Sequence, residues 1–264
     1  MAGLFQVLKG SADGSFKKAA ELKGTDGEPL IIPIKDKTEQ VQNICTRPTA
    51  VDWDGDGKLD LVVGNFAGSF YLFRGEGKGQ FAPKPEMLMA GASPLQIKGV
   101  HSDPFVVDMD GDGDLDLVSG SSNGGVQWAE NTAGKGKRPE LKQFVALIAP
   151  SQDVPYGQPV QDENIKGPSN STRVWVDDVN GDGKLDILVG DNVTLVSPAK
   201  GLSLAEFKKK SDEWQMEFDQ ATRINAADKD AAEKASKRIN ELYAARQKFV
   251  SEDRTGFVWL YLAK

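Results

Sequence analysis

The sequence predicts an all-β fold built from repeated β-hairpins and interrupted once by α-helices. Two observations support this prediction. An acidic, glycine-rich segment recurs three times with short apolar runs on both sides, and a stretch rich in Ala, Lys and Glu, without Pro or Gly, precedes the last apolar run. Short apolar runs separated by turn residues are typical of all-β domains, so the helical stretch is expected to be an insertion.

The composition is that of an ordinary globular protein. Of 264 residues, 39% are hydrophobic and 27% are charged, and the mean hydropathy is −0.41. No apolar run approaches about 18 residues, so no membrane span is expected. The first ten residues, MAGLFQVLKG, lack the basic and apolar regions of a signal peptide. The net charge of −7 argues against nucleic acid or an anionic membrane as partner.

Three segments align without gaps, and they begin at residues 51, 107 and 177. Their sequences are VDWDGDGKLDL, VDMDGDGDLDL and DDVNGDGKLDI. Each follows a strand-like run and continues into an apolar run that ends in glycine, which reads LVVG, LVSG or ILVG. The repeated unit is therefore a β-hairpin with an acidic tip, and internal repetition of this kind indicates a repeat architecture.

A partial copy of the unit precedes the three full copies. Residues 2–32 match residues 67–97 at a constant offset of 65, with a Gly-x-Phe strand, a glycine turn and a second strand. Four strands per unit predict the blades of a β-propeller. The expected blades are a half blade at 2–32, full blades at 46–97 and 102–148, and an interrupted blade at 172–264.

These blades amount to about 3.5 per chain, whereas a propeller closes with about four to eight. We therefore expect an incomplete ring. Either the chain is a fragment of a longer protein, which we favour, or another chain completes the ring.

The acidic loops carry oxygen ligands at constant spacing. In the pattern D-x-[DN]-x-D-G-x-x-D, side-chain oxygens stand at positions 1, 3, 5 and 9, and position 7 offers its backbone carbonyl. An oxygen cage rich in carboxylates suits a hard cation such as Ca²⁺, so about three structural Ca²⁺ ions are predicted. The predicted metal ligands are Asp52, Asp54, Asp56, Lys58 and Asp60; Asp108, Asp110, Asp112, Asp114 and Asp116; and Asp178, Asn180, Asp182, Lys184 and Asp186.

Charge and glycine placement support the calcium prediction. Three bound divalent cations would change the net charge from −7 to −1. Glycine at position 6 permits the left-handed turn that folds the loop. An EF-hand is excluded, because position 12 is Val63, Ser119 or Val189 where an EF-hand has Glu. The alternative is that Asp and Gly only form turns here, but three copies with the same ligand positions favour the metal.

These residues resemble the FG-GAP/VCBS repeat family, which forms the blades of the integrin α-subunit headpiece and of many bacterial surface and secreted proteins. The resemblance rests on the D-x-D-G-D-G-x-x-D-L core, the apolar strand after it and the Gly-x-Phe/Val strand. It implies a propeller whose loops bind structural Ca²⁺ on one face of the ring, and a cell-surface or secreted location. Asn65-Phe-Ala-Gly68 matches the family's Phe-Gly and Gly-Ala-Pro signature only loosely, which favours a bacterial member. The family's usual ring has seven blades, more than this sequence provides.

The insertion is predicted to be an α-helical hairpin over residues 202–253. Ser203 and Glu206 form a capping box at the start of the first helix, the second helix is expected at about 229–250, and the β pattern is expected to resume at Thr255. Acidic and basic residues balance over this stretch. The hairpin is either a self-contained decoration or an arm that docks a partner.

The predicted function is non-catalytic: a calcium-stabilised scaffold whose ligand is a protein or a glycan. The single histidine, His101, precedes Ser102 and Asp103, but these residues lie where the chain enters a blade, and a Ser-Asp pair also helps a tight turn. The alternatives are a lectin-like propeller, an accessory domain of a polysaccharide-active enzyme, or an enzyme that uses the central cleft.

Other side chains are assigned structural roles. Arg47 and Arg173 each stand five residues before an acidic loop, where they either line the centre of the ring or brace neighbouring blades. The tryptophans of the blades are expected to be core residues and not sugar platforms: Trp53, Trp128, Trp175 and Trp259.

Overall fold

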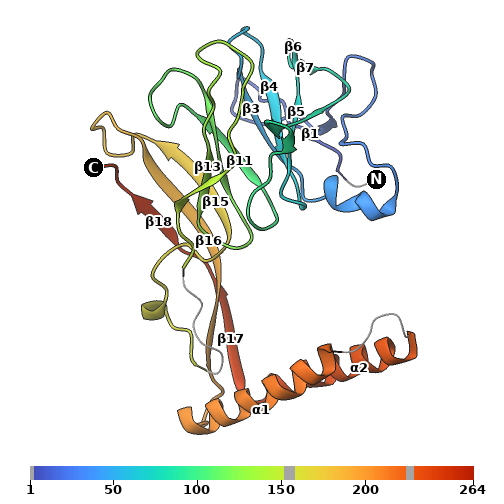
Figure 1. The fold of residues 1–264 in the computed structure, drawn as a ribbon, viewed down its shortest axis with the longest axis vertical. Helices are drawn as coiled ribbons and strands as arrows, with labels where there is room; N and C mark the ends of the chain where they lie inside the picture. Colours follow the sequence, from blue (N-terminus) through green and yellow to red (C-terminus); the bar gives the residue numbers. More distant parts are fainter. Residues whose placement is uncertain (1–2, 152–157, 224–228) are drawn as a thin grey trace. The chain divides into compact units, whose positions relative to one another are not determined.

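The structure is a computed structural model that describes residues 3–151, 158–223 and 229–264. Their regular secondary structure is mostly β-strand, with two long helices (Figure 1). They form two compact units. The larger unit comprises Met1–Pro150, Gly167–Asp191 and Phe257–Lys264, and the smaller unit comprises Ser151–Lys166 and Asn192–Gly256.

The larger unit is built from antiparallel β-strands and one short 3₁₀ helix, Lys37–Gln42. Its strands are β1 (Gln6–Val7), β2 (Ala20–Glu21), β3 (Arg47–Val51), β4 (Asp60–Gly64), β5 (Phe70–Phe73), β6 (Gly75–Gly77), β7 (Gln80–Phe81), β8 (Glu86–Met87), β9 (Met89–Ala90), β10 (Ser93–Pro94), β11 (Asp103–Val107), β12 (Asp116–Gly120), β13 (Val126–Ala129), β14 (Val145–Ile148), β15 (Asn170–Asp177), the first part of β16 (Asp186–Pro198), and β18 (Val258–Tyr261).

Three sheets repeat one arrangement. The first has the order β3-β4-β5-β8, the second has β11-β12-β13-β14, and in the third β16 pairs with both β15 and β18. The first hairpin of each sheet closes around an acidic loop, as in the pairings of Val51 with Asp60 and of Val107 with Asp116. Within the described residues each sheet is open.

The sheets pack face to face, and this explains the uninterrupted apolar runs. Val62 on β4 and Leu117 on β12 belong to the core between the first and second sheets. The alternate residue Val63 faces the N-terminal segment, and Val118 faces the third sheet. Because successive side chains of a strand point to opposite faces, a strand buried on both faces reads as a continuous hydrophobic run.

A glycine ends each apolar run for a steric reason. A Cβ atom on Gly64 would lie 2.4 Å from the carbonyl oxygen of Ser102, and one on Gly120 would lie 2.2 Å from that of Thr172. In both cases the obstacle is the segment that leads into the next sheet. A Cβ atom on Gly190, in the third sheet, would meet nothing within 4 Å.

Equivalent residues of the three sheets also form an ion-pair bridge. Asp103 stands five residues before its loop, as Arg47 and Arg173 do. Its Oδ1 lies 3.9 Å from Arg47 Nε and 3.3 Å from Arg173 Nη1. The two arginines therefore brace neighbouring sheets through Asp103, and burial is the main cause that raises the pKa of that carboxyl.

The smaller unit contains α1 (Leu204–Thr222), α2 (Lys229–Arg246), β17 (Val250–Thr255) and a 3₁₀ helix, Asp162–Asn164. The predicted capping box at Ser203 and Glu206 is present. The β pattern resumes at Val250 and not at Thr255, because β17 pairs with the second part of β16 from Val193 to Pro198. The smaller unit therefore includes more of the chain than the predicted insertion at 202–253.

The two helices form an antiparallel hairpin with its own core. Trp214 of α1 donates from Nε1 to the carbonyl oxygen of Leu242 in α2 at 2.7 Å, and Glu217 pairs with Arg238 one turn further along. The indole ring stacks on Phe218, with the ring centroids 4.8 Å apart. In the part of the chain that the structure describes, neither helix is long and apolar enough to cross a bilayer.

Candidate metal centre

The three acidic loops connect the first two strands of each sheet. We refer to residues 52–60, 108–116 and 178–186 as loop 1, loop 2 and loop 3, and we number the positions of each loop from 1 to 9. Glycines at positions 4 and 6 have positive φ in every loop, for example 71° at Gly55 and 83° at Gly57. These left-handed residues fold each loop back on itself, which glycine permits at little cost.

The same backbone hydrogen bonds recur in the three loops. The carboxylate at position 1 accepts from the N–H at position 6, at 3.0 Å in loops 1 and 2 and at 2.9 Å in loop 3. The carboxylate at position 5 accepts from the N–H at position 7, at 2.9, 3.0 and 2.9 Å. The loops thus share one conformation as well as one sequence pattern.

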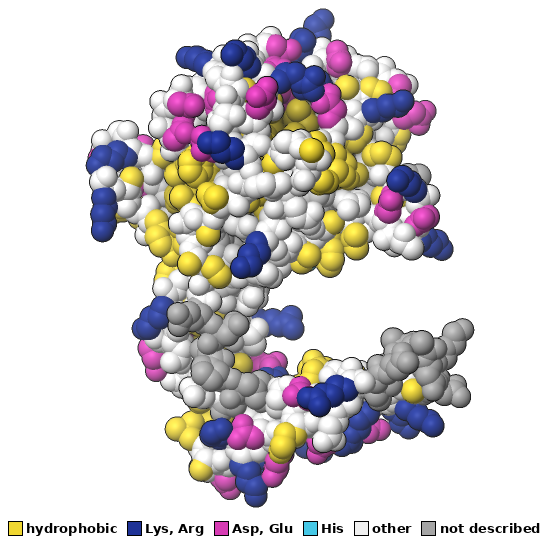
Figure 2. Space-filling model, in the orientation of Figure 1, with side chains coloured by type: hydrophobic (Ala, Val, Ile, Leu, Met, Phe, Trp, Pro, Cys, Tyr) yellow, Lys and Arg dark blue, Asp and Glu magenta, His cyan; other side chains and the backbone are white. Residues whose placement is uncertain are grey.

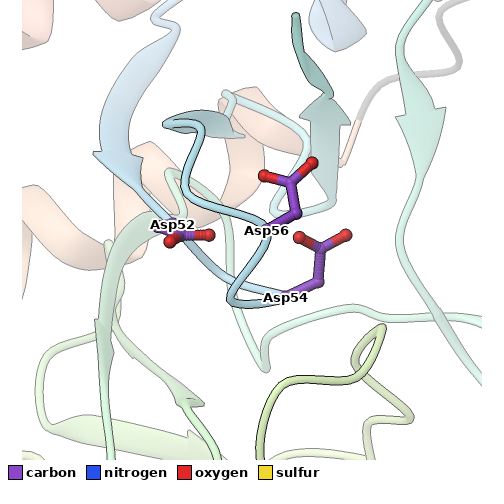
Figure 3. Close-up of side chains that lie close together, drawn as sticks. All are labelled: Asp52, Asp54 and Asp56. Atoms are coloured by element: carbon purple, nitrogen blue, oxygen red, sulfur yellow. The ribbon is translucent and has the colours of Figure 1, made fainter. Parts of the chain in front are cut away.

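Positions 1, 3 and 5 converge in loops 1 and 2. In each of these loops the three carboxylates offer oxygen atoms that all lie within 4.8 Å of one another. Figure 3 shows Asp52, Asp54 and Asp56 projecting from the single turn of loop 1. In loop 3, Asn180 stands at position 3, and its Oδ1 accepts from the Asp182 N–H at 2.8 Å.

The carboxylate at position 9 is buried in every loop and ties the loop to the strand beyond it. Asp60 accepts from the N–H of Gly75 at 2.7 Å, Asp116 from that of Asn131 at 2.7 Å, and Asp186 from that of Ala263 at 2.9 Å. The second oxygens of Asp116 and Asp186 accept from the N–H at position 2. Position 9 therefore serves the architecture of the sheet in addition to any role as a ligand.

Buried carboxylate oxygens without hydrogen-bond partners gather in loop 1. Of the four within the described residues, three belong to this loop, namely Asp52 Oδ1, Asp54 Oδ1 and Asp60 Oδ2, and the fourth is Asp114 Oδ1 in loop 2. Burial is the main cause that raises the pKa of Asp60, and it does the same for Asp116. A buried anion without a donor is unfavourable in a folded protein, and a cation bound among these oxygens would remove that cost. The residues thus fit a hard divalent cation.

The side chain at position 7 lies differently in loops 1 and 2. Lys58 pairs its Nζ with Asp56 at 2.8 Å and remains exposed. Asp114, by contrast, has a buried side chain: Oδ2 accepts from the Gly134 N–H at 2.6 Å, and Oδ1 is a buried atom without a partner. Loop 2 therefore has a fifth carboxylate, and this one is buried. A backbone-carbonyl ligand at position 7 stays a prediction.

Two side-chain contributions to the site go beyond the sequence-based prediction, which assigns Asp114 only a backbone carbonyl. One is the Asp114 side chain, which stands out in sequence because the other two loops have Lys at position 7. The second is Arg74, whose Nη1 lies 2.9 Å from Asp54 Oδ2. Arg74 lies outside the loop, and only the return of β5 to the loop brings it there.

Comparisons with known proteins agree with the repeat pattern. A family model for an FG-GAP-like repeat matches residues 52–119 and 108–189. Each match runs from one acidic loop into the second strand of the next sheet. No curated protein is similar enough to this chain to count as a match.

Among solved structures, the chain is similar to a lectin of Agrocybe aegerita whose structure describes specific recognition of non-reducing terminal N-acetylglucosamine. The TM-score is 0.36 and the identity 17%, over 76% of this chain and 44% of that chain. This chain thus spans less than half of the lectin chain. The two family matches together extend from residue 52 to residue 189, more than half of the sequence. The chain therefore belongs to the FG-GAP-like repeat family.

Proposed function

We propose that this chain is a calcium-stabilised β-propeller segment with a non-catalytic role as a structural or protein-interaction scaffold. The observation that supports this most directly is loop 1, where three converging carboxylates and the buried position-9 carboxylate leave oxygens without donors. Loops 2 and 3 repeat its backbone conformation. A bound cation would supply the charge that this arrangement lacks.

Calcium is the cation that the donor set favours. All candidate ligands are oxygens, most of them carboxylates, and Ca²⁺ accepts six to eight such ligands in flexible geometry. Mg²⁺ demands a stricter octahedral arrangement and usually keeps several waters. Extracellular calcium modules bind with dissociation constants of about 10⁻⁴–10⁻³ M, and we propose an extracytoplasmic setting for this protein.

The bound cation has a structural role in this proposal. The loop closes the first hairpin of each sheet, and position 9 links the loop to a later strand, at Gly75 in the first sheet. A cation held by the loop would therefore lock the turn and the sheet edge together.

The non-catalytic proposal is supported by the surroundings of His101. Ser102 is fully buried, and its Oγ donates to the Ser69 carbonyl oxygen at 2.8 Å and accepts from the Asn65 N–H at 2.8 Å. Asp103 is engaged with two arginines. Two of the three residues that resemble a catalytic group in sequence, Ser102 and Asp103, are thus engaged in contacts that link neighbouring sheets.

The scaffold role is supported by the open face of the third sheet. A Cβ atom on Gly190 would meet nothing within 4 Å, whereas one on Gly64 or Gly120 would clash with the segment that leads into the next sheet. Trp175, Val258 and Leu260 are exposed by 56%, 75% and 48%, whereas β4 and β5 of the first sheet are buried on both faces. We propose that another blade-like sheet packs here, from a longer form of the protein or from a partner chain.

Thermal unfolding in Ca²⁺, Mg²⁺ and EDTA tests the proposal. Ca²⁺ alone is expected to raise the melting temperature, and at 100 times the dissociation constant each independent site contributes about 2.7 kcal/mol. Solution mass measured on the same samples reports whether chains associate through the open face. A cooperative melt that is the same in Ca²⁺ and EDTA would contradict the calcium proposal.

Glycan binding is the second candidate, and Trp175 is the observation in its favour. Its indole ring is more than half exposed and packs edge-on against Phe105, with centroids 5.1 Å apart. Exposed aromatic rings combine an apolar face with a polar edge and suit amphipathic ligands. A glycan screen in Ca²⁺ tests this candidate, and a screen without any binder would rule it out for the glycans tested.

A further inference from the structure

One position next to the acidic loops carries a different charge in each sheet. The position-9 carboxylate of each loop accepts a hydrogen bond from the N–H of Gly75, Asn131 or Ala263. The position in question is the one directly before that N–H donor. The residue at this position is Arg74 in the first sheet, Glu130 in the second and Leu262 in the third. The three sheets therefore offer an internal comparison of a cation, an anion and an apolar side chain at one place.

Arg74 is the member of this set that contacts a loop. Its Nη1 lies 2.9 Å from Asp54 Oδ2, and its Nε donates to Glu86 Oε1 at 3.1 Å. The other oxygen of Glu86 accepts from Arg138 at 2.5 Å. The Arg74 and Asp54 side chains are only 24% and 17% exposed, so solvent screens this pair less than an open surface pair. Figure 2 shows acidic and basic side chains intermingled at the upper end of the larger unit, near β6 and β7 of Figure 1.

The second sheet has the reversed ion pair, and this pair does not reach the loop. Glu130 takes the place of Arg74 and pairs with Lys142 at 2.6 Å, where Glu86 and Arg74 pair in the first sheet. Within the described residues no basic side chain forms an ion pair with a carboxylate of loop 2. Loop 2 also contains the additional buried carboxylate of Asp114.

We propose that Arg74 is a built-in counter-cation of loop 1. It holds one oxygen of Asp54 and leaves the other, Oδ1, buried without a partner beside Asp52 and Asp56. The guanidinium thereby offsets part of the repulsion among the loop carboxylates when no divalent cation is bound. Its charge also opposes a divalent cation in the same loop.

The consequence is that the loops differ in calcium affinity, and this inference rests on the proposed function. Loop 1 keeps its conformation at low calcium and fills at higher calcium. Loop 2, with five carboxylates and no ion-pair partner, depends on the cation and fills first. Ligand charge sets calcium affinity in oxygen sites, so the difference follows from the residues at equivalent positions and not from the motif itself.

The test uses Arg74→Met, with Lys142→Met as the matched control that breaks the equivalent ion pair away from a loop. Calcium titration by calorimetry is expected to show that one site of the wild type, the loop 1 site, becomes about tenfold tighter in R74M, because a positive charge near the cation is removed. K142M and the charge-conserving R74K are expected to titrate like the wild type. Adding Asp52→Asn, which removes a loop 1 ligand, is expected to abolish the R74M effect.

Thermal unfolding in EDTA provides a second readout. R74M is expected to melt below K142M in EDTA and to recover most of that difference in saturating Ca²⁺. Equal calcium affinities for R74M and K142M would overturn the counter-cation role while leaving the proposed function intact. A wild type that binds no calcium would instead overturn the proposed function, and R74M would then be destabilised equally in EDTA and in Ca²⁺.

Discussion

Three buried aspartates, Asp60, Asp116 and Asp186, show how one residue type serves two purposes in this protein. Each accepts a backbone hydrogen bond from the residue two positions beyond the third strand of its sheet, and each stands at a predicted ligand position. Asp60 differs from the other two because its Oδ2 is buried with no donor in hydrogen-bond geometry, although the nearby Trp53 N–H interacts with the carboxyl and opposes the rise in its pKa. A buried anion in this state destabilises the cation-free fold and favours cation binding.

Asp60→Asn is expected to stabilise the protein in EDTA at pH 7 by about 1 kcal/mol, because the amide keeps the Gly75 hydrogen bond and removes the buried charge. Burial raises the pKa of Asp60 above its usual 3.8. The contribution of Asp60 to stability is therefore full below pH 3.8 and is lost as the pH rises through the folded-state pKa. The advantage of D60N in EDTA should accordingly grow from pH 3.8 to neutral pH.

Chemical denaturation across this pH range measures the effect. In saturating Ca²⁺ the order is expected to invert, because D60N removes a ligand. Asp253→Asn, a change at an exposed carboxylate of β17, serves as the control and should leave the pH profile unchanged. A D60N variant less stable than the wild type at pH 7 in EDTA would contradict the assignment of Asp60 as an uncompensated buried charge.

At the scale of elements, the second strand of each sheet explains the architecture. β4 and β12 are buried on both faces between neighbouring sheets. Each ends in a glycine because the next segment crosses too closely for a side chain. The third sheet ends its apolar run in the same residue, Gly190, although no segment of the larger unit crosses it within 4 Å. The repeat thus preserves the sequence of a packed sheet at a place where the described residues place nothing against the glycine.

Gly64→Ala and Gly120→Ala are expected to destabilise the protein by about 1–3 kcal/mol, the usual cost of overpacking. Their Cβ atoms would lie 2.4 and 2.2 Å from backbone carbonyl oxygens. Gly190→Ala is the matched control and should change the unfolding free energy little, since its Cβ atom would meet nothing within 4 Å. Equal losses at all three glycines in denaturant titrations would show that backbone freedom, and not sheet contact, selects glycine here.

At the scale of the whole molecule, the two units have separate hydrophobic cores, and the acidic loops belong to one of them. The three acidic loops belong to the larger unit, whereas the core of Phe207, Trp214 and Leu242 belongs to the helical hairpin. Charge is divided in the same way: the loops carry the acidic excess, and acidic and basic residues balance in the hairpin. Calcium is therefore expected to act on one unit and not on the other.

Amide hydrogen exchange followed by mass spectrometry measures this division. Adding Ca²⁺ is expected to slow exchange in the acidic loops and in β4 and β12, because bound cations close the local openings of these turns. Exchange in α1 and α2 should stay the same. Equal slowing in both helices would contradict the division and indicate that calcium stabilises the chain as a single cooperative unit.

Much of the fold is readable from local patterns. The spacing of acidic and apolar residues identifies the three hairpins, because a strand alternates faces and a tight loop needs glycine. The capping box at Ser203 marks the helix start to the residue, since that signal lies within four consecutive positions. The sequence does not reveal the strand Val250–Thr255. This segment has no apolar alternation and becomes a strand only by pairing with β16.

The repeat, the loop positions and the family can be read from the sequence, because these depend on residues close together along the chain. Which charges meet depends on the tertiary structure. Arg74 reaches Asp54 across 20 residues, and Asp103 joins Arg47 to Arg173 across separate sheets. Such contacts depend on how sheets stack and where strands return, and no local pattern encodes them. The three loops share one sequence pattern, and their charge environments differ both at positions 3 and 7 and through the side chains that the fold brings beside them.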